Sequence, residues 1–157
     1  MDNVTNAYIA GFLDGDGSIM LQIKPREDCR YKYRITSTIC MYQHKSHEKA
    51  LKLIRCRLKL GYVSRRNDGM TEYRIDGHGS VAKVLNMLKP HLLFKKAQTK
   101  YALQAIKLLQ KQSLLPKQFL KACKLCDKIS SFNYSVSRKH TSKTVRKAFK
   151  KQRLFSP

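Results

Sequence analysis

The chain has 157 residues, with 33 Lys and Arg against 10 Asp and Glu, and therefore a formal net charge of +23. This length predicts a single domain over residues 1–157, and the charge argues against the mixed surface of an ordinary soluble enzyme and favours a polyanionic partner. Five cysteines, an odd number, argue against a disulfide framework, and the sequence shows no secretory signal, no membrane-spanning apolar run and no membrane-binding helix.

The first predicted element is a short helix that runs into residues 9–17, IAGFLDGDG, with Thr5 or Asn6 as its N-cap. Small side chains recur along it at intervals of three and four positions, so a second helix could approach this face closely. Such a face suits a tight crossing within the chain or a two-fold crossing with a second copy. The residues on it are Ala7, Ala10, Gly11, Asp14 and Gly15.

The end of this helix carries Asp14 and Asp16 in its last turn. Helix C-termini carry partial negative charge and favour Lys, Arg or His there. A divalent metal ion would supply the missing positive charge, because Mg²⁺ is typically held by one or two carboxylates with waters and substrate phosphates. The alternative is a solvated turn, or an Asp that caps the next segment.

The residues that follow alternate between apolar and polar, first as strands and then with helical period. The predicted elements are strands 19–26 and 33–41, a helix over 46–60, strands 62–66 and 71–75, and helices over 80–89, 95–111 and 116–129. Each pair of strands is predicted to form a hairpin. The order α-ββ-α-ββ-α with extra C-terminal helices predicts an α+β fold with four antiparallel strands.

The segment 133–157 is polar and basic, and a short helical pattern lies within it. A frayed terminus is one interpretation. Given the charge of the chain, we favour a segment that follows the phosphate backbone of a nucleic acid, because hydroxyls and cations alternate along it. Its candidate contacts are Ser135, Lys139 and His140.

Residues 9–17 resemble the LAGLIDADG motif of homing endonucleases, and the four positions that depart from the motif keep their apolar or small character. The similarity extends over most of the chain, to residues 17–19, 22–25 and 61–63, Pro90, Lys95, Gln98 and 142–146. The chain looks like the single-motif subgroup that algal organelle introns encode. The resemblance implies a saddle-like sheet backed by helices and a homodimer that hydrolyses both strands of a long, near-palindromic DNA target, which promotes intron homing.

The resemblance also implies a metal site. In the family the eighth motif residue, here Asp16, reaches the metal, and a backbone carbonyl one residue earlier, here Gly15, assists it. The expected ion is Mg²⁺, with Mn²⁺ or Ca²⁺ able to occupy the site. In two copies the motif helices would cross and bring both Asp16 carboxylates beside the two-fold axis. The contact residues would be Ala7, Ala10, Gly11, Asp14 and Gly15.

Polar residues around the metal order water and neutralise the transition state in the family. By position they fall on Gln43, Lys95 and Gln98, and Asp14 falls on a supporting position. Relatives often have a basic residue shortly after the glutamine. For this catalytic position the chain offers His47, with Lys45 and His44 as alternatives.

Recognition is expected from the strands, because a two-stranded ribbon fits the major groove and presents side chains to the base edges at two-residue intervals. A solvated sheet face is the alternative. The candidate DNA contacts are Gln22, Lys24, Arg26, Arg34, Thr36 and Thr38 on the first hairpin and Ser64, Arg66, Glu72 and Arg74 on the second.

Other functions suit the same fold. A group I intron maturase would bind intron RNA and would typically lack a metal-ligand Asp, whereas a non-cutting regulator would tolerate Asp16→Asn. A ribosomal protein would explain the charge but not the carboxylates at a helix end. Without a visible transit peptide, we expect a protein made where it works, in an organelle, with the chloroplast favoured over the mitochondrion.

Overall fold

Alternating side chains build one curved antiparallel sheet. In the computed structural model, which describes residues 2–133, 138–152 and 154, the strands are β1 (Gly17–Pro25), β2 (Tyr33–His44), β3 (Tyr62–Arg65) and β4 (Met70–Asp76). Within this part of the chain they pair in the order β1-β2-β4-β3. Ile19, Ile39 and Ile75 are paired in register and buried on one face, so the polar residues between them lie on the other face.

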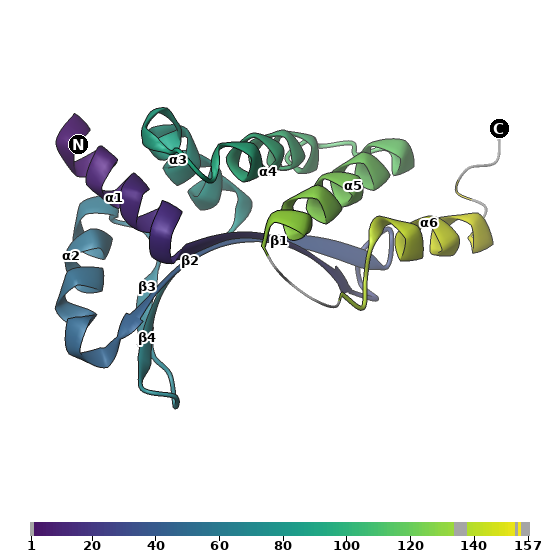
Figure 1. Cartoon of the computed structure of the whole chain (residues 1–157). Coiled ribbons are helices and arrows are strands. Elements are labelled where there is room, and N and C mark those ends of the chain that lie inside the picture. The colour runs from purple at the N-terminus through teal and green to yellow at the C-terminus, as the bar shows by residue number, and fades with distance from the viewer. Residues whose placement is uncertain (1, 134–137, 153, 155–157) are drawn as a thin grey trace.

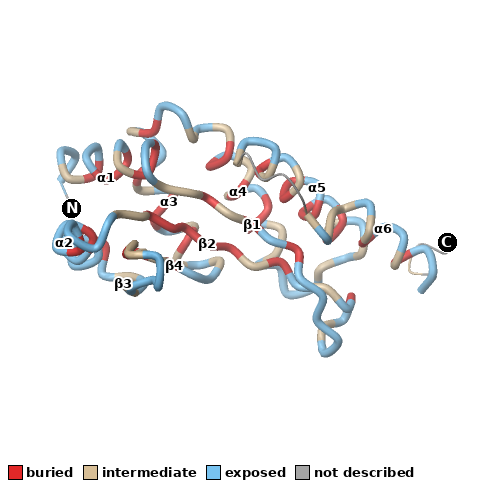
Figure 2. Tube along the Cα trace, turned by 60° about the horizontal axis from the view of Figure 1, so that its bottom comes forward, coloured by how far each residue is buried: buried red, intermediate tan, exposed pale blue. Residues whose placement is uncertain are grey.

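Helices cover the convex side of the sheet, and Figure 1 shows the sheet as an arch whose concave face is left open. Buried residues, red in Figure 2, alternate with exposed ones along these helices, as expected of amphipathic helices that pack on a core. This is the saddle with backing helices that the sequence predicted. The helices are α1 (Asn3–Asp16), α2 (Glu48–Leu58), α3 (His78–Leu88), α4 (Lys96–Leu109), α5 (Pro116–Phe132) and α6 (Ser142–Lys151), with 3-10 turns η1 (Lys45–His47) and η2 (Lys89–His91).

Helix α1 begins earlier than predicted and leads directly into β1. Its N-cap is Asp2, whose carboxylate accepts hydrogen bonds from the Thr5 backbone N–H at 2.7 Å and from the Thr5 hydroxyl at 3.0 Å, so the prediction of Thr5 or Asn6 as N-cap was wrong. At the other end, a Cβ on Gly17 would lie 2.8 Å from the backbone oxygen of Leu13. Glycine therefore permits the abrupt change from helix to strand.

The described part of the C-terminal segment packs on the core and is not frayed. Val145 and Phe149 of α6 are fully buried. The ring of Phe149 lies with its centroid 5.1 Å from Tyr31 and 6.0 Å from Phe119. Burial of such a side chain stabilises a fold by about 2–3 kcal/mol, so α6 holds the basic segment against the loop of the first hairpin.

Candidate active site and nucleic-acid interface

Asp14 organises the junction between α1 and α4. Its carboxylate is almost completely buried and accepts three backbone N–H hydrogen bonds, from Leu93 at 2.6 Å, Phe94 at 3.1 Å and Lys95 at 2.9 Å. Its own backbone oxygen accepts a hydrogen bond from Nζ of Lys95 at 2.5 Å. The first motif aspartate therefore fixes both the start of α4 and the lysine beside it, which is consistent with the supporting position that the resemblance implies.

Asp16, the second motif aspartate, is exposed at the C-terminal end of α1. Its Oδ2 accepts a hydrogen bond of 2.7 Å from the Gln43 side chain, which β2 supplies. Since residue 43 pairs with Thr71 at the far end of the β2–β4 ladder, the sheet sets the position of this amide. The structure thus brings together two of the residues that the sequence predicted for the active site.

The oxygen donors at this helix end suit a hard divalent cation. They are the Asp16 carboxylate and the Gly15 backbone carbonyl, beside the negative end of the helix. Within the described part of one protomer, no three His, Cys, Asp or Glu side chains gather into a metal-binding cluster. The remaining ligands would therefore come from waters, from a phosphate or from a second protomer, which matches the few protein ligands that Mg²⁺ usually takes.

Lys95 lies beside both motif carboxylates. Partial burial lowers the pKa of its ammonium group, and the charges of Asp14 and Asp16 oppose this shift. It lines a cavity of about 470 Å³ together with Gly15, Gln98 and Phe94. Gln98 is buried, and its side-chain oxygen has no partner among the described protein atoms, so it can accept a hydrogen bond from a water in this cavity.

His47 is exposed at the start of α2, and among the described residues no hydrogen bond links it to Asp16, Gln43 or Lys95. The neighbouring His44 bonds Ser46 locally at 2.9 Å. The geometry therefore does not select His47 over Lys45 or His44, and its catalytic role stays a prediction.

The concave face of the sheet carries the predicted base-contacting side chains in register. Gln22 pairs with Thr36 and Lys24 with Arg34 between β1 and β2, while Ser64 pairs with Glu72 between β3 and β4. The face continues across the sheet, because Cys40 of β2 pairs with Arg74 of β4. One polar surface thus runs over all four strands of the described sheet.

A hydrogen-bonded network on this face holds Arg74. Its Nε donates to both Asp76 oxygens at 3.0 and 3.2 Å, and its Nη1 donates to Glu72 at 3.3 Å. Asp76 also accepts from the Thr38 hydroxyl at 2.6 Å and from Tyr62 at 3.4 Å. Burial alone would raise the pKa of Asp76, but the bonds from Thr38 and Arg74 lower it below its usual value, so the carboxylate stays ionised.

The network corrects the prediction for Thr38. Its side chain lies on the concave face by register, but the residue is only 4% exposed and its hydroxyl is used by Asp76. It therefore supports the network and offers almost no surface to a base. Asp76 itself was not among the predicted residues, because its role depends on partners that only the strand register brings together.

Two predicted arginines at the margins of the sheet are already paired with carboxylates. Arg26 follows the end of β1 and bonds Asp28 at 2.7 Å. Arg66 follows β3 and bonds Asp68 at 3.0 Å, with Glu72 3.9 Å away. A duplex would have to compete with these partners, or bind alongside them.

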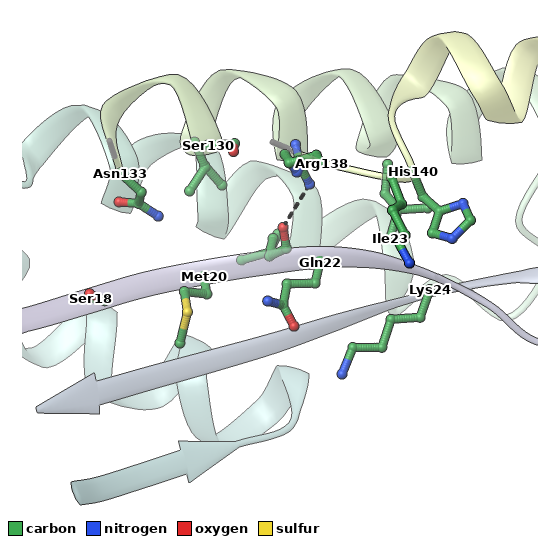
Figure 3. A pocket seen from close by; sticks show the side chains of 12 residues that line it. Ser18, Met20, Gln22, Ile23, Lys24, Ser130, Asn133, Arg138 and His140 are labelled. Carbon is green, nitrogen blue, oxygen red and sulfur yellow. Dashed lines mark hydrogen bonds between the residues drawn. The ribbon is translucent and has the colours of Figure 1, made fainter. Parts of the chain in front are cut away.

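Arg138 anchors the basic C-terminal segment to the edge strand β1. Its guanidinium donates to the backbone oxygen of Leu21 at 3.3 Å (Figure 3) and to Asp127 at 3.1 Å. A cavity of about 370 Å³ opens there, lined among others by Gln22, Lys24, Lys139 and His140. The predicted backbone contacts Lys139 and His140 therefore lie beside the predicted base contacts of β1, whereas Ser135 lies outside the described residues.

The outer face of α1 is exposed and apolar. It presents Val4 and Tyr8, which line a cavity of about 390 Å³ with Leu53 of α2. Ala7, Gly11 and Gly15 are exposed on the same helix. Ala10 and Asp14, in contrast, are buried inside the protomer, so only three of the five predicted contact residues lie on the surface that a second copy would meet.

The reason is the helical period. Residues 7, 11 and 15 follow one another at intervals of four, and residues 10 and 14 follow the neighbouring row that faces the core. Val4, Tyr8 and Leu53 were not predicted, although their apolar side chains at intervals of four on α1 were a visible signal.

No helix in the described ranges is long and apolar enough to cross a membrane.

Comparison with known proteins finds a family model and two relatives that match the chain. The sequence model of the LAGLIDADG endonuclease family matches residues 9–108. The chain is 35% identical over 150 residues to DNA endonuclease I-CvuI of Chlorella vulgaris, across 96% of the chain and 92% of that protein. It is 34% identical over 139 residues to DNA endonuclease I-CreI of Chlamydomonas reinhardtii, across 88% of the chain and 85% of that protein.

A similar structure has been solved with DNA. The crystal structure of I-CvuI in complex with the I-CreI target, in the presence of Mg, superposes with a TM-score of 0.90 at 34% identity and covers 98% of the chain and 96% of I-CvuI. An archaeal intron-encoded endonuclease, I-Vdi141I, shares the fold with a TM-score of 0.86 at 20% identity.

Proposed function

Because the chain belongs to the LAGLIDADG endonuclease family, whose members cleave DNA, we propose that two copies of it cut both strands of one long, near-palindromic duplex. The observation that carries this proposal is the end of α1, where Asp16 bonds Gln43 and lies near Lys95, at the point where the helix leads into the first strand of the curved sheet. A single protomer has one such helix end, so two cuts need two protomers.

We propose that Asp16 and the Gly15 carbonyl hold a divalent ion, Mg²⁺ in the natural reaction, with Mn²⁺ or Ca²⁺ able to bind the same oxygens. When bound, such an ion polarises the phosphoryl group and lowers the pKa of the attacking water. The crystals of I-CvuI with Mg and with Ca support a divalent ion in this family. The Gln43 amide keeps the Asp16 carboxylate oriented toward the ion.

Lys95 is proposed to stabilise the negative charge that develops on the phosphate. Its Nζ uses one of three donors on the Asp14 carbonyl, which leaves two for phosphate oxygens. Because Asp14 also binds the backbone N–H of Lys95, the ammonium group is held before the substrate arrives. Such preorganised charge is often the largest contribution to catalysis.

The concave face is proposed to read the target. The arginines and lysines of β1, β2 and β4 suit guanine, Gln22 suits adenine, and Glu72 can accept from cytosine. Lys139 and His140 are proposed to contact the phosphate backbone at the end of β1, where the Arg138 hydrogen bonds hold their segment. In the structures of I-CvuI this family fold is bound to DNA targets.

The proposed dimer would form through the outer face of α1. Its exposed glycines and alanine allow close helix approach, and Val4, Tyr8 and Leu53 supply apolar surface that water otherwise covers. A two-fold crossing there would place the two Asp16 side chains near the axis.

The test is a selection from a randomised duplex library with the purified protein and Mg²⁺, run beside Asp16→Asn and sequenced for cut ends. We expect cutting at one near-palindrome by the wild type and a loss of more than about 100-fold in Asp16→Asn with unchanged binding, since the variant removes the charge that holds the ion. Equal cutting by both proteins would refute the metal assignment.

The same experiment separates the alternatives. Enrichment of bound but uncut duplexes by the wild type would indicate a non-cutting regulator, and enrichment of intron RNA alone would indicate a maturase. The retained Asp16 favours the endonuclease. Both curated relatives come from algae, which supports the proposal that the protein works in an organelle, with the chloroplast favoured.

A further inference from the structure

Positive charge dominates the outer surface of the C-terminal helices. From Gly77 to the C-terminus the sequence has one acidic residue, Asp127, and Arg138 and the Ser142 backbone N–H already occupy its two oxygens. Exposed lysines recur along each helix at intervals of three, four or seven positions. They are Lys96, Lys100 and Lys107 along α4, with Lys111 just beyond its end, Lys117, Lys121, Lys124 and Lys128 along α5, and Lys143, Lys147 and Lys150 along α6.

These lysine stripes, as we call the three rows, face away from the sheet. In α4 the buried residues include Gln98, Ala102 and Ile106, about half a turn from the lysine row. The same holds in α5, whose buried residues include Cys123 and Cys126. Because α4 and α5 cover the convex side of the sheet (Figure 1) and their lysine rows lie opposite their buried residues, we place the rows of these two helices on the side of the molecule away from the concave face. A duplex held in the concave face would leave these two rows free.

No lysine of the stripes is paired with a carboxylate among the described residues. Ordinary exposed helices alternate acids and bases at these spacings, which adds a few tenths of a kcal/mol per pair. Here the like charges repel one another, and this repulsion opposes the compact state. A polyanion bound to the stripes would remove the repulsion.

Two of the stripes meet at one groove. A cavity of about 290 Å³ is lined by Lys107, Lys111 and Lys121 together with Gln104, Leu108 and Leu125. Three lysines, from α4, from the turn just after it and from α5, therefore line a single hollow. Lysine binds phosphate as a point charge without reading bases.

The partner that fits best is double-stranded. Proteins that bind single strands offer aromatic side chains on which bases stack, whereas the exposed positions of α4 are lysines and a glutamine, and Tyr101 is covered by Lys128 at 5.2 Å. We propose that the lysine stripes bind the phosphate backbone of a second, non-target DNA duplex while the concave face holds the target. DNA is the partner because it is the polyanion that the enzyme already meets in excess. This inference rests on the proposed DNA-binding function.

The test uses the full chain as Asp16→Asn, so that the target stays uncut, with a target duplex and a non-target duplex that carry different dyes. The labelled target duplex is bound to saturation first, and the labelled non-target duplex is then titrated at several salt concentrations. Two variants are compared: Lys107→Gln with Lys121→Gln, from the groove, and Lys83→Gln with Lys89→Gln, two exposed lysines on α3 and η2 that match the change in charge.

We expect the groove variant to lose about tenfold or more in affinity for the non-target duplex. The slope of log affinity against log salt concentration should fall by about 2, because each phosphate contact contributes about 0.9. Affinity for the target should change less than about twofold in both variants. Equal losses in the two variants, no binding of the second duplex, or tighter binding of an RNA duplex than of DNA would each refute the inference. Failure of the labelled target duplex to bind would instead contradict the proposed function.

Discussion

Asp14 supports the active site through three backbone N–H groups on a segment about 80 positions away in the sequence. We expect Asp14→Ala to lower the free energy of unfolding by about 3 kcal/mol or more, because each buried donor left without a partner costs about 1–3 kcal/mol. Urea unfolding of the two proteins measures the difference. Cleavage should fall as well, since Lys95 loses its anchor.

Asp2 provides the control for this prediction. It is also an aspartate that binds a helix start, but it is exposed, and Asp2→Ala should cost only about 1 kcal/mol. If both variants were equally stable, the buried carboxylate would not hold α4 as we argue.

Arg74 and Asp76 give a prediction about specificity. Asp76 and Glu72 bind Nε and Nη1 of Arg74, and among the described residues no hydrogen bond is made by Nη2, so its two donors are available to a ligand on the concave face. We expect Arg74→Ala to reduce the preference for one base, at a single symmetric pair of target positions, by about 1–3 kcal/mol. Asp76→Asn should reduce the base preference at the same positions. A uniform loss of affinity at all targets would show a phosphate contact instead.

The sequence identified Asp16, Gln43 and Lys95 by resemblance, and the structure brings Asp16 to Gln43 and Lys95 close to both motif aspartates. It could not identify Asp76, because a carboxylate near the end of one strand becomes a support only when its register places Thr38 beside it. Nor could the spacing alone decide which row of the motif helix faces inward. That choice depends on the partners of Asp14, which lie in the segment 93–95 just before α4.

At the scale of elements, the start of α2 is tied to β3 by charge. Glu48 bonds Arg65 at 2.6 Å and pairs with Lys52, and these bonds lower its pKa to about 2. Since this value lies below that of the unfolded chain, ionised Glu48 stabilises the fold above about pH 4.5, and the contribution is lost as the pH falls toward 2.

We therefore expect Glu48→Gln to be less stable than the wild type at pH 7 and equally stable near pH 2. Urea unfolding at a series of pH values measures this, with Glu27→Gln, an exposed loop carboxylate, as the comparison. A stability difference that did not change with pH would show that packing, not charge, makes the contribution.

Element boundaries were predictable where local pattern decides them and not where tertiary partners do. Alternation predicted both hairpins, but β2 continues to His44 because Gln43 and His44 pair with Thr71 and Met70 of β4. The tail showed only a short helical pattern, and its docking depends on the aromatic contact between Phe149 and Tyr31. Neither contact is visible in a window of neighbouring residues.

For the whole molecule, function depends on whether two protomers assemble through α1. Gly11 tests this directly, because a Cβ built on it meets no atom of its own protomer within 4 Å. Gly11→Val should therefore leave the protomer folded, while its side chain would obstruct a close two-fold helix crossing. We expect this variant to sediment at the 18.2 kDa mass of one protomer and to make no double-strand cut.

Gly79 of α3 is the matched control, since an added Cβ there also meets nothing within 4 Å and the residue is not part of the outer face of α1. Gly79→Val should sediment as a dimer, as we expect of the wild type, and should cut both strands. A dimeric and active Gly11→Val would place the subunit contact elsewhere. The two Asp16 sites would then have to reach the opposite strands of the duplex through a different arrangement of the two saddles.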